Sequence, residues 1–267
     1  MYRDKRFAAK PWEIIEKDII EASQSVRDAK GSGLQLLGFD RVFLCDGDAL
    51  ILSTKKLVQI LEAIRHYLPW VTRVSTYGDT RSIKKKTVEE LKQLKALGLG
   101  MVYHGMESGD DEVLTLIEKG GTQSEAIETA RLFKEAGIKH SVMVLLGVGG
   151  KKFSLQHAKN TAATLTQMDP PFVGALTTTL VPETPIAEQE ASGSFELPSK
   201  FEMLQELRTI VAESDFTNCR FSANHASNYL PIRGTLPKDK HAILHALDLT
   251  IERADEALLV PEEFRGL

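Results

Sequence analysis

Short runs of apolar, often β-branched residues alternate along the chain with longer segments whose apolar residues recur at helical spacing. The strands expected from the short runs are residues 41–45, 72–76, 101–104, 140–146 and 172–180. The helices expected around them are residues 11–30, 54–66, 87–97, 110–118, 124–136 and 155–168. This alternation favours an α/β fold with a parallel sheet and helices outside it. Right-handed crossovers then give either an open doubly wound sheet or a barrel.

The pattern changes after Pro185, where Gly193 and Pro198 interrupt the chain. Two more helices are expected at residues 200–214 and 238–259, with a short apolar segment between them. We therefore interpret residues 1–190 as one domain built from strand–helix units. Residues 191–267 are interpreted as a helical C-terminal extension packed on the same core.

Composition and charge disfavour several classes of protein. Lys and Arg total 33 against 37 Asp and Glu, a net charge of −4, so a nucleic-acid surface is not favoured. The two cysteines, Cys45 and Cys219, cannot form a disulfide framework, and we expect both to be buried structural thiols. No signal peptide and no apolar run long enough for a transmembrane helix is found. A soluble, cytoplasmic protein without membrane contact is expected.

The candidate functional residues follow the expected strands, because ligands bind at the carboxyl ends of parallel strands. The residues at these ends are Asp46, Gly47, Asp48, Ser75, Tyr77, Glu107, Ser108 and Gly147. The two aspartates could bind an ammonium group or a metal, or could simply cap a turn. Ser75 and Tyr77 suit a polar pocket wall or a solvated loop. Glu107 favours function, because an unpaired carboxylate at a buried strand end is costly.

Other catalytic patterns are weak. Two thiols outside any CxxC pair and seven histidines without HExxH give no metal site by spacing. No GxSxG nucleophile elbow is present. His104 is expected to be a buried strand residue, with ligand contact as the alternative. The glycines that begin at Gly147 do not match a P-loop, but they would let a flat ligand approach the strand end.

Five segments in order resemble the radical S-adenosylmethionine (SAM) superfamily. They are FLCDGDAL at 43–50, VSTYG at 74–78, YHGMESGDDEVL at 103–114, KG at 119–120 and LLG at 145–147. The branch they resemble most contains oxygen-independent coproporphyrinogen oxidases and Elp3-like proteins. Met143 departs from that branch, whose substrate strand carries an aspartate there, and this argues against a porphyrinogen substrate.

The resemblance implies a partial (β/α) TIM-like barrel, a SAM ligand and a [4Fe–4S] cluster held by a CxxxCxxC motif. It also implies a small-molecule substrate and an electron donor such as flavodoxin or ferredoxin. By this resemblance, the segment from Asp46 to Asp48 meets the SAM ammonium, and Ser75 and Tyr77 line the pocket. Glu107, followed by Ser108, faces the ribose or amino end. Lys119 pairs with the SAM carboxylate, and Gly147 borders the adenine.

The sequence departs from the family pattern in one chemically important way: the cluster-binding motif CxxxCxxC does not occur in it. The relatives continue from their third cysteine into a segment like residues 2–7, so the chain is expected to begin just after the cluster loop and to lack the first barrel strand. Either Met1 is an internal residue of a longer protein, which we favour, or the chain is a natural remnant without a cluster. Without a cluster this polypeptide is not expected to perform radical catalysis.

Two alternatives remain open. One is a non-catalytic SAM- or nucleotide-binding module, and the other is an α/β-barrel hydrolase or lyase with Glu107 and Asp46 as acid and base. The substrate is expected near residues 177–179, Asn224, His225 and Asn228. A barrel without one edge strand exposes backbone groups near the second strand, which predicts self-association or poor stability.

Overall fold

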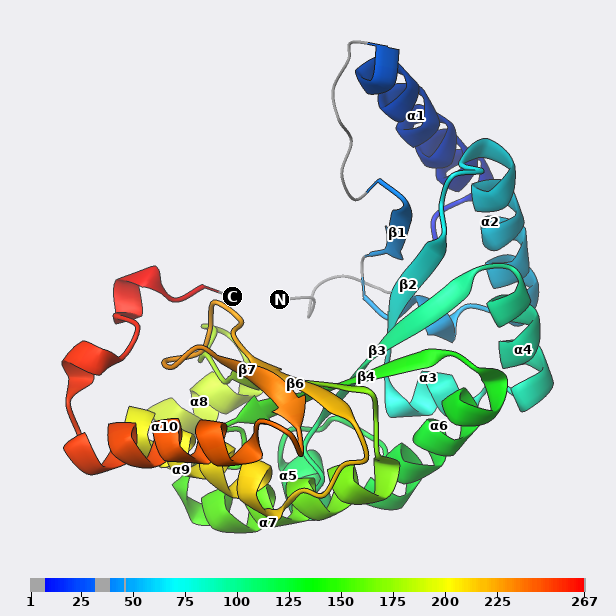
Figure 1. The fold of residues 1–267 in the computed structure, drawn as a ribbon. Helices are drawn as coiled ribbons and strands as arrows, with labels where there is room; N and C mark the ends of the chain where they lie inside the picture. Colours follow the sequence, from blue (N-terminus) through cyan, green and yellow to red (C-terminus); the bar gives the residue numbers. More distant parts are fainter. Residues whose placement is uncertain (1–7, 32–38, 46, 267) are drawn as a thin grey trace. The chain divides into compact units, whose positions relative to one another are not determined.

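The structure, a computed structural model, describes residues 8–31, 39–45 and 47–266. Seven strands of these residues form one sheet in the order β1-β2-β3-β4-β5-β6-β7 (Figure 1). β1 pairs with β2, β4 with β5, and β5 with β6 in parallel, whereas β6 and β7 are antiparallel. The predicted α/β class with a mostly parallel sheet is confirmed.

Backbone contacts divide the chain into two compact units. The N-terminal unit contains residues 8–103 and 132–139 of the described chain, and the C-terminal unit contains residues 104–131 and 140–266. Each unit has a hydrophobic core made only of its own residues.

In the N-terminal unit the helices pack on one face of the strands (Figure 1). Its helices are α1 (Trp12–Gly31), η1 (Ala49–Ile51), α2 (Thr54–Tyr67), α3 (Thr80–Lys84) and α4 (Val88–Ala96). Its strands are β1 (Arg41–Leu44), β2 (Arg73–Gly78) and the first half of β3 (Leu99–Glu107). Side chains alternate along a strand, so Val42, Val74 and Val102 reach the helices and join a core with Ile64 and Leu94.

The C-terminal unit contains the second half of β3 and the remaining strands. These strands are β4 (Lys139–Leu146), β5 (Phe172–Thr177), β6 (Cys219–Ala223) and β7 (Ile232–Leu236). Its helices are α5 (Asp111–Leu116), most of α6 (Gln123–Ala136), α7 (Gly150–Met168), α8 (Pro185–Ala191), α9 (Lys200–Glu213), α10 (Lys240–Arg253), η2 (Glu256–Leu258) and η3 (Glu262–Phe264).

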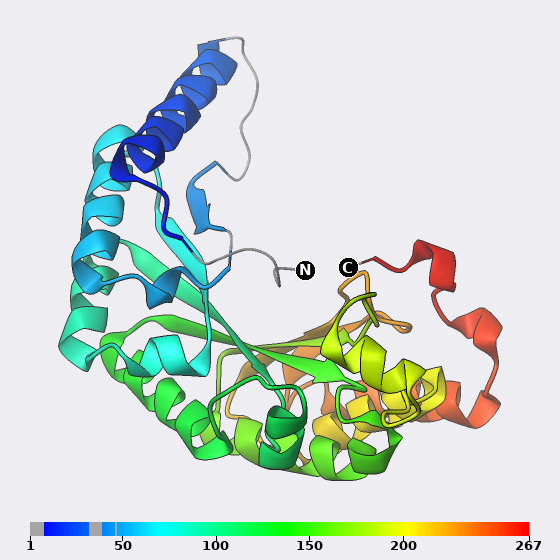
Figure 2. The ribbon, with the colours of Figure 1, turned by 180° about the vertical axis from the view of Figure 1, so that it is seen from behind.

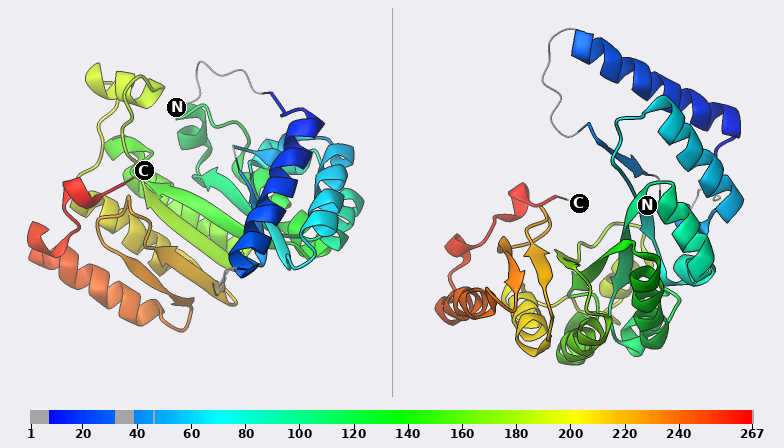
Figure 3. Two further views of the ribbon diagram at one scale, coloured as in Figure 1. Left: turned by 90° about the horizontal axis from the view of Figure 1, so that it is seen from above. Right: turned by 45° about the vertical axis from the view of Figure 1, so that its right-hand side comes forward.

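A layer formed by α7, α9 and α10 covers one face of strands β4–β7 (Figure 1). Val142 and Val144 of β4, Phe221 of β6, and Leu207 and Ile210 of α9 are buried in the core between them. α8 lies apart from this layer, in front of it in Figure 2 and above it in the left panel of Figure 3.

Capping side chains explain where several helices begin. Ser53 accepts a hydrogen bond from the first turn of α2. Thr87 with Glu90 at α4, and Ser199 with Glu202 at α9, form reciprocal capping boxes. Each cap satisfies backbone N–H groups that have no partner inside the helix.

Some boundaries differ from the sequence predictions. β3 begins at Leu99 instead of residue 101. Gly100 therefore lies within the strand, where a Cβ would come 2.6 Å from Arg73 Cγ. α7 begins at Gly150, five residues before its predicted start. β5 ends at Thr177 and α10 at Arg253, both earlier than predicted. α3, α8 and β7 were not predicted. None of the described helices has both the length and the apolar character needed to span a bilayer.

Candidate ligand-binding residues in the two units

The loop after β1 is held in place by Asp48. Its carboxylate caps η1 by accepting from Leu50 N at 3.0 Å, and it also accepts from Asp79 N at 3.2 Å. Burial raises the pKa of Asp48, and the hydrogen bonds oppose that shift. Gly47 precedes it with φ of 91° and open space around its Cα. Asp48 thus orders two neighbouring loops, while Asp46 lies outside the described residues.

Ser75 and Tyr77 lie on the face of β2 opposite the helix-packed face. Ser75 is buried, whereas the Tyr77 side chain is 48% exposed. The Tyr77 ring lies 4.7 Å from Phe43 and 6.2 Å from Tyr103, centroid to centroid. The three rings form an aromatic cluster on β1, β2 and β3, which can contact a flat or apolar ligand by ring stacking.

Glu107 and Lys119 form an ion pair in the C-terminal unit. Lys119 Nζ lies 2.8 Å from Glu107 Oε1, and the two side chains are 26% and 18% exposed. Glu107 has φ of 66°, a left-handed conformation that is unfavourable for a glutamate. A Cβ on Gly105 would lie 2.7 Å from Glu107 Oε1 and 3.3 Å from Lys119 Nζ, so a larger residue would displace the ion pair from its present position.

Strained backbone at a non-glycine residue persists where the surrounding structure holds it, and such strain gathers at functional sites. A carboxylate paired with an ammonium is also chemically complementary to an α-amino acid group, which carries the opposite charges in the same arrangement. The Glu107–Lys119 pair can therefore exchange its internal contact for contacts with an amino acid ligand.

Ser108 follows Glu107, and its hydroxyl is used by the fold. It is fully buried, hydrogen-bonds His157 Nδ1 at 2.8 Å and accepts from Asp110 N at 3.0 Å. Asp110 in turn caps α5 by accepting from Val113 N. The structure therefore gives Ser108 a role in fixing the loop between Glu107 and α5.

Gly147, at the end of β4, is hydrogen-bonded to a side chain of α9. It has φ of 80°, and its N–H donates to Glu206 Oε2 at 2.6 Å. A Cβ at this position would lie 2.8 Å from Met203 Cε, so this side chain would have to move, and the positive φ also disfavours a larger residue. Burial raises the pKa of Glu206 to about 7. Glu206 was not predicted from the sequence, because a glutamate within an amphipathic helix normally faces solvent.

A cavity lies where β4 and β5 end. Thr177, Thr178, Thr179 and His225, near which the substrate is expected, line it. Asn228 does not: its Nδ2 donates to Ala175 O, and its Oδ1 accepts from Thr177 Oγ1. The exposed Asn224 is also outside the lining residues, with Oδ1 accepting from Ser222.

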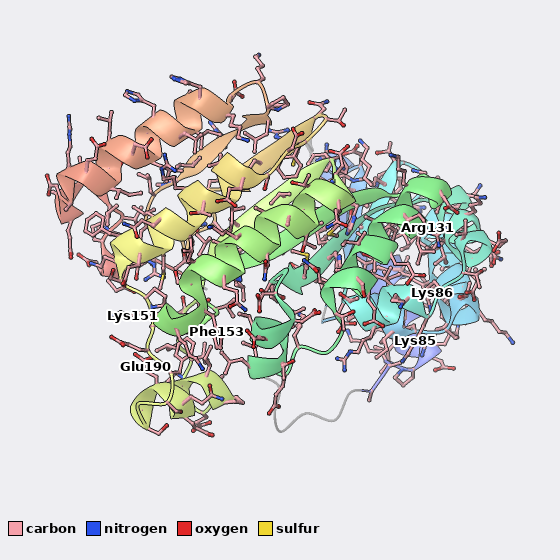
Figure 4. The ribbon with its side chains drawn as sticks, turned by 90° about the horizontal axis from the view of Figure 1, so that it is seen from below. Lys85, Lys86, Arg131, Lys151, Phe153 and Glu190 are labelled. Atoms are coloured by element: carbon pink, nitrogen blue, oxygen red, sulfur yellow. The ribbon has the colours of Figure 1, made fainter. Side chains whose placement is uncertain are left out.

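The wall of the cavity contributed by α8 is tied to the start of α7. Glu190 of α8 accepts from Leu197 N at 3.0 Å, and Lys151 of α7 binds Glu196 at 2.5 Å. Figure 4 shows Lys151 and Phe153 at the first turn of α7 with Glu190 close to Lys151. These contacts fix the segment that follows β5.

The prediction that both thiols are buried is confirmed for Cys219 and wrong for Cys45. Cys219 is buried, and burial raises its thiol pKa to about 12, but Cys45 is exposed at the end of β1. Cys45 follows directly after the last residue of β1. No group of three metal-binding side chains is found among the described residues.

Comparisons with known proteins identify a family and a fold. The family model of the radical SAM superfamily matches residues 16–165. The fold is similar to an N-terminally deleted archaeal Elp3 of Methanocaldococcus infernus (TM-score 0.58, 13% identity, 92% of this chain and 61% of that chain). It is also similar to coproporphyrinogen III oxidase of Escherichia coli, described as a radical SAM enzyme (0.56, 15%, 78% and 48%). Methylornithine synthase is a third such structure (0.52, 16%, 75% and 54%).

These likenesses show the fold, a partial TIM-like barrel, as predicted. The chain spans 61%, 48% and 54% of the lengths of the three solved chains. A search of curated protein sequences gives no match.

Proposed function

Because the chain belongs to the radical SAM superfamily, we propose that it binds S-adenosylmethionine, with Glu107 and Lys119 recognising the amino acid end of the ligand. The ion pair carries this proposal, because its carboxylate suits the SAM ammonium and its ammonium suits the SAM carboxylate. The left-handed backbone of Glu107 supports it, since the fold maintains strain at this residue.

Within the C-terminal unit, we propose that Gly147 borders the adenine and that Ser108 acts by positioning Glu107. Taken alone, the N-terminal unit offers an aromatic cluster with Ser75 that suits stacking against a flat group, and Gly47 leaves room for close approach. Asp46 and Asp48 remain candidates for binding an ammonium group.

The [4Fe–4S] cluster of the family does not fit the residues of this chain. Such a cluster takes three cysteine ligands here, with SAM at the fourth iron, and the sequence contains two cysteines. Of these, Cys219 is a buried thiol whose raised pKa keeps it protonated. We therefore propose that these 267 residues bind SAM but do not cleave it reductively, and that radical chemistry requires thiolates from outside them.

For a form that carries the cluster, we propose a small-molecule substrate and an electron donor of the flavodoxin or ferredoxin type. A cytoplasmic location is proposed from the two free thiols, which persist in a reducing compartment.

Isothermal titration of the purified chain with SAM tests the proposal. We expect one binding site, and about tenfold or greater weakening in Lys119→Met, because a charge-assisted hydrogen bond contributes about 1.5–3 kcal/mol. Glu107→Gln should weaken binding in the same direction. Lys159→Met, which removes an exposed lysine of α7 in the same unit, is the matched control.

Equal affinity in Lys119→Met and Lys159→Met would contradict the role of the ion pair. Absence of SAM binding by the folded wild-type chain would contradict the proposed function itself. Release of 5′-deoxyadenosine by this chain, after anaerobic incubation with iron, sulfide and a reductant, would contradict the proposal that it does not cleave SAM.

A further inference from the structure

The cavity at the ends of β4 and β5 has a volume of about 370 Å³ and lies wholly within the C-terminal unit. Its walls are mainly aliphatic side chains from α5, β4, β5 and α8, among them Ile117, Leu145, Leu176 and Ile186. Of the described residues that line it, none carries a carboxylate, an ammonium or a guanidinium group. A volume of this size is typical of sites for small organic molecules.

The lining selects against charged ligands. A charged group that leaves water needs an opposite charge or several hydrogen bonds to replace its hydration, and these walls contain no charged side chain. The Thr177 hydroxyl already donates to Asn228, and its N–H donates to Ser227 Oγ. Thr178 Oγ1 is buried without a hydrogen-bond partner among the described residues, so the polar groups left to a ligand are neutral: this hydroxyl and His225.

His225 supplies a defined hydrogen-bond donor. Its Nδ1 lies 3.2 Å from Ser227 N, and a backbone N–H can only donate, so Nδ1 is the acceptor. Ser227 Oγ, at 3.0 Å, donates to the same nitrogen while accepting from Thr177 N. The neutral imidazole therefore carries its proton on Nε2. Since the ring lines the cavity and is exposed, Nε2–H is available to an acceptor atom of a ligand.

We propose that this cavity binds an uncharged, mainly aliphatic molecule or chain that presents a carbonyl or similar oxygen to His225 Nε2–H. Its assignment as the substrate subsite rests on the proposed function. Ile117 lies two residues before Lys119, and Leu145 two residues before Gly147, so the cavity adjoins the segments proposed to hold SAM. The binding prediction itself is independent of SAM.

Three probes of equal chain length test the proposal: 2-octanone, octanoate and octylammonium. Binding to the full chain is followed by methyl NMR, with the methyl groups of Ile117, Leu176 and Ile186 as reporters. We expect 2-octanone to shift these resonances, and both charged probes to bind at least about tenfold more weakly, because the walls cannot compensate a charge.

His225→Leu tests the donor without adding a charge. It should weaken 2-octanone binding about two- to tenfold, the range for one neutral hydrogen bond, while leaving the cavity apolar. His241→Leu, at an exposed position on α10, is the matched control and should leave the affinity unchanged. Ile186→Glu places a carboxylate in the wall and should abolish 2-octanone binding.

Several outcomes would overturn the proposal. One is octanoate or octylammonium binding as tightly as 2-octanone. Another is 2-octanone shifting only methyl groups of the N-terminal unit, such as those of Val42, which would indicate unspecific partition into apolar surface. Equal affinity in His225→Leu and wild type would remove the assigned donor. A chain that binds 2-octanone but not SAM would refute the proposed function and leave the cavity assignment standing.

Discussion

His104 and His140 lie in the core of the C-terminal unit with their rings stacked, and His104 Nδ1 lies 3.0 Å from His140 Nε2. Both side chains are almost inaccessible to water. Burial, with a smaller contribution from the charge of Lys119, lowers the pKa of His104 from 6.5 to about 3. Burial and the neighbouring His104 place the pKa of His140 well below 6.5.

This pair predicts that acid destabilises the protein before its carboxylates are protonated. In the unfolded chain both histidines bind protons near pH 6.5, whereas in the folded state they stay neutral until much lower pH. Their contribution is therefore fully present above pH 6.5 and is lost as the pH falls toward 3. Each histidine lowers the free energy of unfolding by up to about 1.4 kcal/mol per pH unit in that window.

Urea unfolding at about pH 7.5 and about pH 5.5 measures this effect. Followed by circular dichroism, the step that unfolds the C-terminal unit should have a lower midpoint at the acidic pH. The pH difference should be smaller in His140→Phe, which removes one titrating ring and keeps the aromatic stack. His241→Gln changes an exposed histidine and should keep the wild-type pH difference. A wild-type midpoint that does not change between the two pH values would contradict the prediction.

Single residues differed in how far the sequence could predict them. Glu107 was predicted to be functional because an unpaired buried carboxylate is costly; the structure instead pairs it with Lys119, a contact that the sequence did not predict. The burial of His104 was also predicted, but its contact with His140 was not, because the two residues are 36 positions apart. The exposure of Cys45 was missed, because a cysteine at the end of an apolar run looks like a continuation of the strand.

Among the elements, β1 has an unusual position at the edge of the sheet. Within the described part of the chain it pairs only with β2, and it has four residues. A mainly apolar groove of about 400 Å³ runs beside it, lined by Val42, Phe43, Leu44 and Cys45 from both faces of the strand. Edge strands with unpaired backbone groups and apolar neighbours are sites of pairing between chains.

We therefore predict that the chain self-associates through this edge. Size-exclusion chromatography with light scattering should give a mass above that of one chain that rises with protein concentration. Phe43→Lys, which places a charge on the edge strand, should shift the protein toward the monomer. Because Cys45 is exposed, Cys45→Ser in reducing buffer is needed as a control against disulfide-linked dimers. A monomer at every concentration would refute the prediction.

The regular strand–helix units were predictable, whereas the irregular elements were not. Periodicity located most of the long helices within about one residue at each end, but α7 begins at Gly150 and α10 ends at Arg253, both well before the predicted positions. β7 was missed because Pro231, Gly234 and Pro237 interrupt a strand pattern that pairing with β6 nevertheless stabilises. The short α3 and α8 lack the length over which helical spacing can be recognised.

At the scale of the whole molecule, the chain carries two hydrophobic cores, one in each unit. Cooperative unfolding in a single step requires that the loss of one core also removes the other. Because each core is closed within its own residues, we predict that heat or urea unfolds the protein in two steps.

The two tryptophans make this measurable without labels. Trp12 and Trp70 both pack against the core of the N-terminal unit, so tryptophan fluorescence reports on that half of the protein alone. Circular dichroism reports on the helices of both halves. We expect the two signals to give different unfolding midpoints, and superimposable curves would show one cooperative unit. The natural fluorescence of this protein thus reports unfolding of the N-terminal unit. The cavity assigned to an uncharged ligand lies in the C-terminal unit, whose unfolding this fluorescence does not report.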